Sequence, residues 1–252
     1  MRNDTLLFGT ALALLFAAAI VASQGTNEAL FLWFNREAAI LPDVFWANMT
    51  FAADTLFAVA VIAAVGGRHP HMFNSGIVLL ITGALFVHGL KFWFEIPRPP
   101  AVLDPGTFHL IGPKLTNHAF PSGHSFTALA TAALLAVNIR SNAGAIALIL
   151  LALIAALSRA AVAAHWPLDI LVGSAAGLMI GVLAQRLTNN TWWLQGEGLQ
   201  RFTAAIMTIA CISLLFHDSR YPGTRPLAVA AGLIALLSLA GYWKTTLLRL
   251  RK

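Results

Sequence analysis

Residues 158–169, SRAAVAAHWPLD, place an arginine, a histidine and an aspartate between two long apolar stretches. Charged side chains at the edge of a membrane are costly unless they are paired or have a function. Arg159 offers a planar fork of donors that suits phosphate oxygens. His165 can attack phosphorus and form a phosphohistidine. Asp169, four residues later, can orient the imidazole ring and stabilise positive charge on it. The stretch therefore predicts phosphoryl chemistry.

Two further polar clusters have the same character. KFWFEIPRPP contributes Lys91 and Arg98, and FPSGHS contributes Ser122, Gly123 and His124. Several cations with few acids predict an anionic ligand, and the free N–H groups at a helix start bind anions. Helix capping alone also accounts for the serine. The histidine can donate a proton to a leaving oxygen. No His, Cys and Glu set has metal-cage spacing, so we expect neither a metal nor a cofactor.

The elements that must position these residues are apolar. Of the 252 residues, 58% are hydrophobic and only 10% are charged, whereas about a quarter of a soluble domain is charged. The chain therefore belongs in a bilayer, as an all-α, polytopic helical bundle. Gly173, Gly177 and Gly181 recur every four residues and predict close helix packing. Spans of roughly 17–25 apolar residues are expected near residues 5–22, 49–66, 73–91, 122–139, 142–158, 168–187, 203–216 and 226–243.

Basic residues predict the orientation of these eight spans. With the N-terminus inside, nine Lys and Arg residues lie on the cytoplasmic side and seven on the outer side. Lys91, Arg98 and Arg159 are among the outer seven, and we expect them to bind the anionic ligand. Without these three, nine cytoplasmic basic residues compare with four outer ones, which supports this orientation. Both termini are then cytoplasmic, and all three polar clusters share the outer face. The cytoplasmic nine are Arg2, Arg68, Arg140, Arg186, Arg201, Lys244, Arg249, Arg251 and Lys252.

Three less regular features lie on the same outer side. Residues 27–46 mix aromatic and charged side chains, which fits either an amphipathic surface helix or a plain connecting loop. Residues 92–121 hold six prolines, so no long helix can run through them and an ordered loop is expected. Asp54 lies near the outer end of the second span. It either pairs with a cation of the site and supports it, or meets water at the interface.

The three clusters carry a family resemblance. Lys91 to Pro99 fits K-x6-R-P, residues 121–124 are P-S-G-H, and residues 158–169 fit S-R-x5-H-x3-D. With these signatures in order, the chain resembles the type-2 phosphatidic acid phosphatase superfamily, which includes bacterial lipid phosphatases and vanadium haloperoxidases. The resemblance covers roughly residues 45–187, a six-helix phosphatase core when the first span is added. Residues 203–243 are two additional C-terminal transmembrane helices.

The resemblance implies a role for each matched residue. His165 is the nucleophile and Asp169 its partner, while His124 is the general acid and then activates water. Ser158 also matches, and capping or packing fits it as well as phosphate contact does. The residues expected to hold the phosphoryl oxygens are Lys91, Arg98, Ser122, Gly123 and Arg159.

The expected function is that of a metal-independent phosphatase acting on a lipid phosphate or pyrophosphate in a bacterial inner membrane. Undecaprenyl pyrophosphate is favoured because the predicted topology puts the site on the periplasmic face. Phosphatidylglycerophosphate, phosphatidate and lipid A phosphates are alternatives, as is a phosphotransferase that uses the same intermediate. A transporter would line several membrane depths with polar residues, whereas here they gather at one face. Residues 1–252 are expected to form one integral membrane domain that meets membrane lipids but no nucleic acid; no oligomeric state is predicted.

Overall fold

The computed structural model describes residues 3–250, which form eleven α-helices, one short 3-10 helix and no strand. The predicted all-α class is therefore correct. Arg2, Arg251 and Lys252, which were assigned to the cytoplasmic side, lie outside the described residues. The helices are α1 (Asp4–Gln24), α2 (Asn27–Ala38), α3 (Asp43–Ala52), α4 (Thr55–Gly66), α5 (His71–Trp93), α6 (Pro99–Val102), α7 (Gly123–Ala136), α8 (Asn142–Ala161), α9 (Pro167–Asn190), η1 (Trp192–Gln195), α10 (Glu197–Leu214) and α11 (Arg225–Leu250).

Every predicted span is helical. Five helices are long and apolar enough to cross a membrane: α1, α5, α8, α9 and α11. The pair α3 and α4 would form a sixth span, bent by 61° where the two helices meet. Helix α7 has only 14 residues, or about 21 Å, because the loop before it ends inside the bundle. Helix α10 begins with a polar turn that lowers its hydropathy. The chain is therefore an integral membrane protein.

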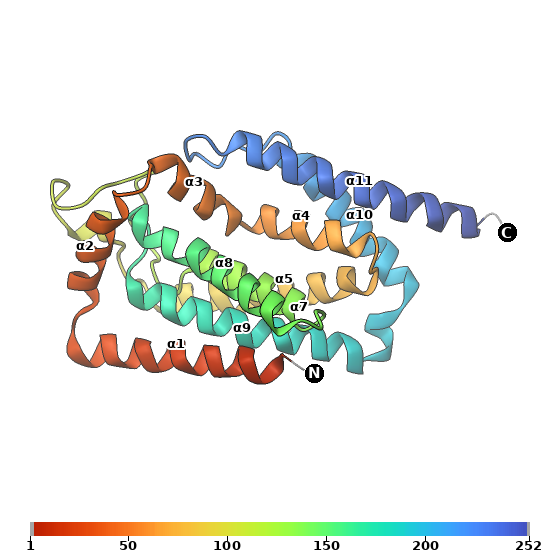
Figure 1. The fold of residues 1–252 in the computed structure, drawn as a ribbon, viewed down its shortest axis with the longest axis horizontal. Helices are drawn as coiled ribbons and strands as arrows, with labels where there is room; N and C mark the ends of the chain where they lie inside the picture. The colour runs from red at the N-terminus through yellow and green to blue at the C-terminus, as the bar shows by residue number, and fades with distance from the viewer. Residues whose placement is uncertain (1–2, 251–252) are drawn as a thin grey trace.

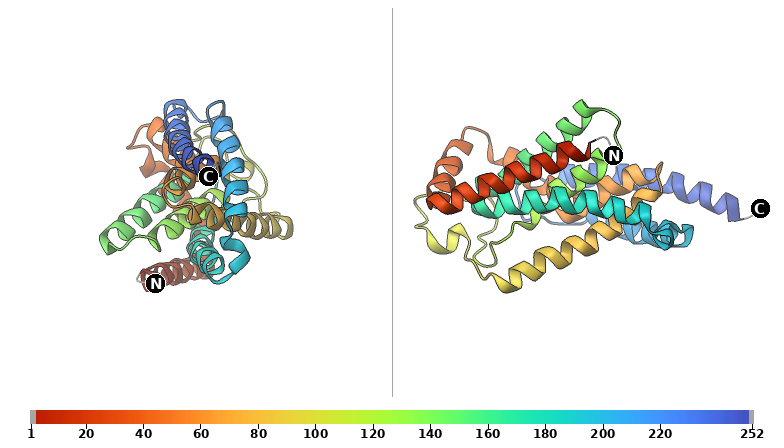
Figure 2. Two further views of the ribbon diagram at one scale, coloured as in Figure 1. Left: turned by 90° about the vertical axis from the view of Figure 1, so that its right-hand side faces the viewer. Right: turned by 90° about the horizontal axis from the view of Figure 1, so that it is seen from below.

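The helices run along one long axis (Figure 1). In that view α2, the loop of residues 94–122 and the α10–α11 loop lie toward the left-hand end, whereas α1 begins and α11 ends toward the right. The end-on view in Figure 2 places α1 and α11 on opposite sides of the bundle. All the loops that carry the predicted site residues therefore gather at one end.

The contact between α7 and α9 depends on three glycines. A Cβ on Gly173 would lie 2.5 Å from the carbonyl oxygen of Ser122, and one on Gly181 would lie 2.6 Å from that of Ala130. Gly177 meets the carbonyl of Phe126 in the same way. Small residues let two helix backbones approach closely. The predicted glycine packing thus fixes α9, which carries Asp169, against the start of α7.

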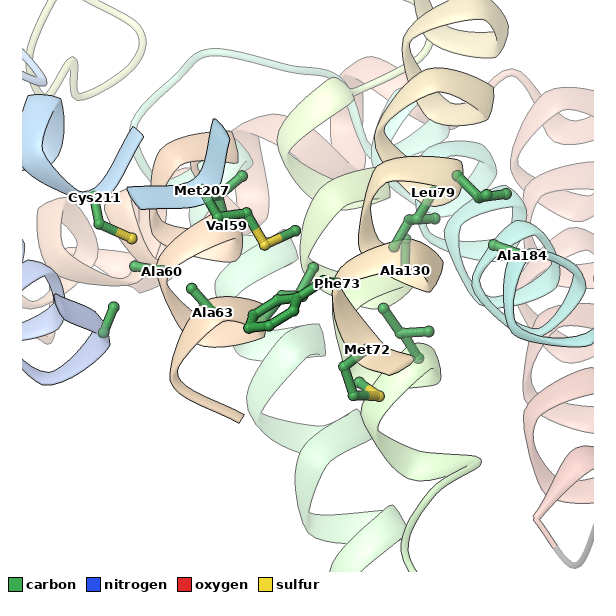
Figure 3. Close-up of a cluster of buried hydrophobic side chains, with 14 of the residues drawn as sticks. Val59, Ala60, Ala63, Met72, Phe73, Leu79, Ala130, Ala184, Met207 and Cys211 are labelled. Atoms are coloured by element: carbon green, nitrogen blue, oxygen red, sulfur yellow. The ribbon is translucent and has the colours of Figure 1, made fainter. Parts of the chain in front are cut away.

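Apolar side chains from several helices fill the rest of the bundle. In one cluster, Val59 of α4, Phe73 of α5 and Met207 of α10 are buried together (Figure 3). In a bilayer such side chains leave lipid rather than water, so they stabilise the bundle through van der Waals packing. Cys211 of α10 is free and buried in the same cluster, where it acts as a small apolar residue. The two C-terminal helices therefore pack against α4 and α5 as part of one core.

A buried asparagine ties the surface elements to the site. Residues 27–46 form α2, a short turn and the start of α3, so this region is mostly helical. The Nδ2 group of Asn35 in α2 donates to the carbonyls of His109, Ala160 and Ala161, each at 3.0 Å. Its Oδ1 accepts from the backbone N–H of His109 at 2.7 Å. This side chain joins α2, the long loop and the end of α8, next to Arg159.

Candidate active site

The structure brings six of the predicted site residues into one cavity of about 330 Å³. Two cations come from α5 and the loop after it, and one comes from the end of α8. The two histidines come from the start of α7 and from the turn between α8 and α9. The six predicted residues that line it are Lys91, Arg98, Gly123, His124, Arg159 and His165.

Hydrogen bonds determine which ring nitrogen of His165 carries the proton. Arg98 Nη1 lies 3.1 Å from His165 Nε2. An arginine can only donate, so Nε2 must accept and carries the lone pair. The proton is then on Nδ1, which donates to Asp169 Oδ2 at 3.3 Å. The same carboxylate oxygen accepts the backbone N–H of Trp166 at 2.9 Å. Asp169 is 2% exposed and lies behind the ring, away from the cavity.

The environment of His165 keeps its ring neutral. The side chain is buried between α8 and α9, and this burial lowers its pKa well below the usual 6.5. The positive charges of Arg98 and Arg159 lower the pKa of His165 further. Both effects disfavour the imidazolium. At neutral pH the ring therefore offers an unprotonated Nε2 toward the cations.

A compact turn sets the distance between Arg159 and His165. The backbone N–H groups of Ala164 and His165 both donate to the carbonyl of Arg159, at 2.9 and 3.1 Å. Ala163 takes a left-handed conformation with φ of 58°, which is unusual for a residue with a side chain. The alanines of the AAVAA segment are small enough to be buried in this turn, so the segment acts as a rigid spacer.

Backbone carbonyls of the long loop hold the two cations of the first cluster. Arg98 donates to the carbonyls of Asn117 at 2.7 Å, Ala164 at 2.9 Å and His118 at 3.3 Å. Lys91 Nζ donates to the carbonyl of His118 at 2.5 Å. His118 has φ of 54°, which turns its carbonyl toward both cations. The sequence analysis considered only side chains and missed this support.

Neighbouring residues of the PSGH motif have different roles. Ser122 is fully buried and caps α7, accepting from the backbone N–H of Ser125 at 3.3 Å and from its hydroxyl at 2.8 Å. Gly123 and His124 line the cavity. Asp54 Oδ2 lies 3.9 Å from His124 Nε2, while Asp54 Oδ1 caps α4 through the N–H of Leu56 at 2.7 Å. Asp54 thus faces the histidine from the bend between α3 and α4.

Arg159 is the most deeply buried charge of the site, with 1% exposure. Its Nη1 donates to the hydroxyl of Tyr221 at 3.0 Å and to that of Thr50 at 3.4 Å. Ser158 lies next to it but faces Thr50, with 2.6 Å between the two hydroxyl oxygens. Ser158 therefore packs behind the arginine, and it does not line the cavity. Neither Thr50 nor Tyr221 was predicted, because neither lies in a motif.

The site has an excess of positive charge. Within residues 3–250, none of the three cations forms an ion pair with a carboxylate within 4 Å. A buried cation without a counter-ion is costly, so an anionic ligand would stabilise the site. Among the same residues, no three His, Cys, Asp or Glu side chains are grouped as metal ligands.

The remainder of the cavity is apolar. It continues between α4, α5 and α7, from the cations at one end to Ile62 and Leu79 deep in the bundle. From Lys91 back to Leu79 the wall follows twelve residues of α5, or about 18 Å. Ala84 lines this part and is exposed on the outside of the bundle. The cavity thus joins an anion site to an apolar groove that opens sideways.

A membrane-embedded helical bundle with this site is suited to an enzyme that acts on a phosphoryl group. Comparisons with known proteins agree with this class. Residues 73–193 match the sequence model of the PAP2 superfamily. This match includes all three motifs and agrees with the resemblance that they predicted. The superfamily includes membrane phosphatases that act on lipid phosphates, and this membrane-embedded chain is an enzyme of that class.

Two crystal structures have the same fold. LpxE from Aquifex aeolicus is 26% identical with a TM-score of 0.55, and the match covers 64% of this chain and 94% of LpxE. A PAP2-type phosphatidylglycerolphosphate phosphatase from Bacillus subtilis is 19% identical with a TM-score of 0.53. That match covers 75% of this chain and 97% of the other. No curated protein sequence matches the chain significantly.

Proposed function

We propose that the chain removes the terminal phosphate of a lipid phosphate or pyrophosphate through a phosphohistidine. One observation carries this proposal: a single cavity is cationic at one end, next to two histidines, and apolar along the rest of its length. A molecule that fits both parts has an anionic head and a hydrocarbon tail. The head would reach the cations while the tail stays at the depth of the bilayer.

In the first step, Lys91, Arg98 and Arg159 bind the non-bridging oxygens of the phosphoryl group. His165 Nε2 attacks phosphorus, and the P–N bond forms as the bond to the leaving oxygen breaks. His124 must be protonated for this step, which the negative charge of the bound phosphoryl group favours, and it donates its proton to that leaving oxygen. Asp169 stabilises the positive charge that develops on the His165 ring.

In the second step, the now neutral His124 removes a proton from water, and the water oxygen attacks phosphorus. The P–N bond breaks, its electron pair returns to Nε2 of His165, and inorganic phosphate leaves. The position of Asp54, 3.9 Å from His124, supports this step, because a carboxylate there stabilises the protonated imidazole. Transfer of the phosphoryl group to another lipid would use the same intermediate.

For the substrate we propose undecaprenyl pyrophosphate, hydrolysed at the periplasmic face of a bacterial inner membrane. Among the described residues, and with the three cations of the site left out, six basic residues lie at the opposite end of the bundle and four at the site's end, which supports that orientation. Phosphatidylglycerophosphate is the main alternative. The Bacillus subtilis protein named for it is only 19% identical, and such a likeness supports a common fold alone. Phosphatidate and lipid A phosphates also carry a phosphomonoester on an apolar anchor.

The test is an assay of purified full-length protein in detergent with EDTA, against a panel of these lipid phosphates. We expect release of free phosphate from the wild type and its loss in His165→Ala. His69→Ala is the matched control, because His69 is exposed in the turn between α4 and α5, and this turn lies at the end of the bundle away from the site (Figure 1).

Two results would contradict the proposed mechanism: full activity of His165→Ala, or a strict need for added metal. Recovery of a phosphorylated acceptor lipid in place of free phosphate would instead identify a phosphotransferase. Comparing rates across the panel identifies the preferred headgroup and tail.

A further inference from the structure

The loop between α10 and α11, residues 215–224, reaches the active site from outside the three motifs. Its conformation is held by its own hydrogen bonds. Ser219 Oγ lies 2.7 Å from Thr224 Oγ1, and it accepts from the N–H of Tyr221 at 3.1 Å. Thr224 Oγ1 also donates to the carbonyl of Tyr221 at 3.1 Å. The loop therefore presents Tyr221 from a fixed turn.

Tyr221 contacts Arg159 in two ways. Its hydroxyl accepts from Arg159 Nη1 at 3.0 Å, and the guanidinium carbon lies 5.8 Å from the centre of the tyrosine ring. On another side, the ring packs on Gly112, where a Cβ would lie 2.6 Å from a ring carbon. Gly112 has φ of 79°, a conformation that glycine adopts without strain. The ring is thus held between the long loop and the arginine.

These contacts leave part of the guanidinium unpaired. Arg159 Nε is buried and has no hydrogen-bond partner. Nη1 is occupied by Tyr221 and Thr50. A guanidinium is planar, so fixing one nitrogen and the plane also fixes the directions of the other N–H groups. Arg159 lines both the main cavity and a second cavity of about 180 Å³, whose wall includes Tyr221.

We propose that Tyr221 is a positioning residue, which holds Arg159 in the orientation that binds the phosphoryl oxygens. The two C-terminal helices would then complete the active site by supporting this loop. This inference rests on the proposed function, because it takes Arg159 as a phosphate-binding residue. The tyrosine acts through the arginine and needs no contact with the substrate.

The test compares wild type with Tyr221→Phe, which keeps the ring and removes the hydroxyl. Tyr242→Phe is the matched control, because Tyr242 packs its ring against Phe73 in the core, away from the site. We would measure kcat and KM on a lipid phosphate, and the affinity for orthovanadate by isothermal titration. A hydrogen bond to a charged group is worth enough to predict a loss of about tenfold or more in kcat/KM and in vanadate affinity. The control should stay within twofold.

A double variant separates positioning from a general loss of structure. In an Arg159→Met background, adding Tyr221→Phe should change vanadate affinity by less than twofold, because the group it positions is gone. Equal vanadate affinity in wild type and Tyr221→Phe overturns the inference. So does a loss of vanadate affinity from Tyr221→Phe that is as large in the Arg159→Met background as in the wild type. The vanadate titration measures binding and does not require that the protein hydrolyse a substrate. Absence of hydrolysis in the wild type would instead overturn the proposed function and leave the vanadate comparison to decide the role of Tyr221.

Discussion

Replacing Asp169 by asparagine tests whether the carboxylate behind His165 contributes to the proposed reaction. Asp169 Oδ2 accepts from both His165 Nδ1 and the N–H of Trp166. Because both donors meet the same oxygen, an asparagine whose amide oxygen takes that place can accept from both and keep the proton of His165 on Nδ1. The substitution then removes the negative charge behind the ring and leaves the hydrogen bonds in place.

The size of the effect follows from the distance between the two groups. When His165 becomes a cation in the phosphohistidine, a carboxylate at 3.3 Å stabilises it by about 5 kcal/mol at an effective dielectric constant of about 20. Asparagine carries no charge and loses this stabilisation. Each 1.36 kcal/mol corresponds to tenfold in rate, so kcat should fall by roughly 10³–10⁴-fold. The melting temperature should change little, because the cap at Trp166 is retained.

The assay is phosphate release in detergent, with an alkaline quench to trap the phosphohistidine, because its P–N bond is labile in acid. Asp43→Asn is the matched control, since Asp43 Oδ1 lies 2.9 Å from His109 Nε2 in an exposed pair outside the cavity. Its effect should be below twofold. A folded Asp169→Asn protein with activity within about threefold of wild type would refute the reasoning, because the charge of Asp169 would then not matter.

Three further predictions concern the groove, the pH dependence and the helix packing. Ala84→Trp should block the groove and lower activity on long-chain lipids at least tenfold. Leu85→Trp, whose side chain faces lipid beside the groove, should leave this activity unchanged. Equal effects of the two substitutions would mean that the tail binds elsewhere. Because burial and neighbouring cations lower the pKa of His165, its ring should stay neutral as pH falls through 6.5. Nitrogen NMR can follow the protonation of the ring, and the signal that is lost in His165→Asn identifies this residue. A ring that protonates at its usual pH would contradict this. Gly177→Ala should destabilise the protein by about 1–3 kcal/mol, seen as a lower melting temperature, whereas Gly241→Ala, with open space around it, should not.

Much of the site was predictable because its chemistry lies in short motifs. Arg159, His165 and Asp169 are close in sequence, and a single turn followed by the start of a helix brings them together. The placement of all three clusters at one end followed from the number of spans between them. The glycines of α9 were readable in the same way, since their spacing marks one helix face.

The parts that could not be predicted depend on contacts distant in sequence or on the backbone. Tyr221 lies 62 residues after Arg159, and nothing near it in the chain marks it as part of a site. The carbonyl of His118 binds two cations because of its own φ angle, which has no clear signal in the sequence. Asp54 was recognisable in part, because an acid directly before an apolar stretch is a common helix cap.

The sideways opening of the groove at Ala84 has a consequence for kinetics. A lipid that enters there never leaves the bilayer, and its dephosphorylated product returns to the same leaflet. Encounter is then a two-dimensional process, so the concentration that governs the rate is the mole fraction of substrate in the membrane. Diluting the substrate with inert lipid slows such an enzyme even when the amount of substrate per volume of solution is unchanged.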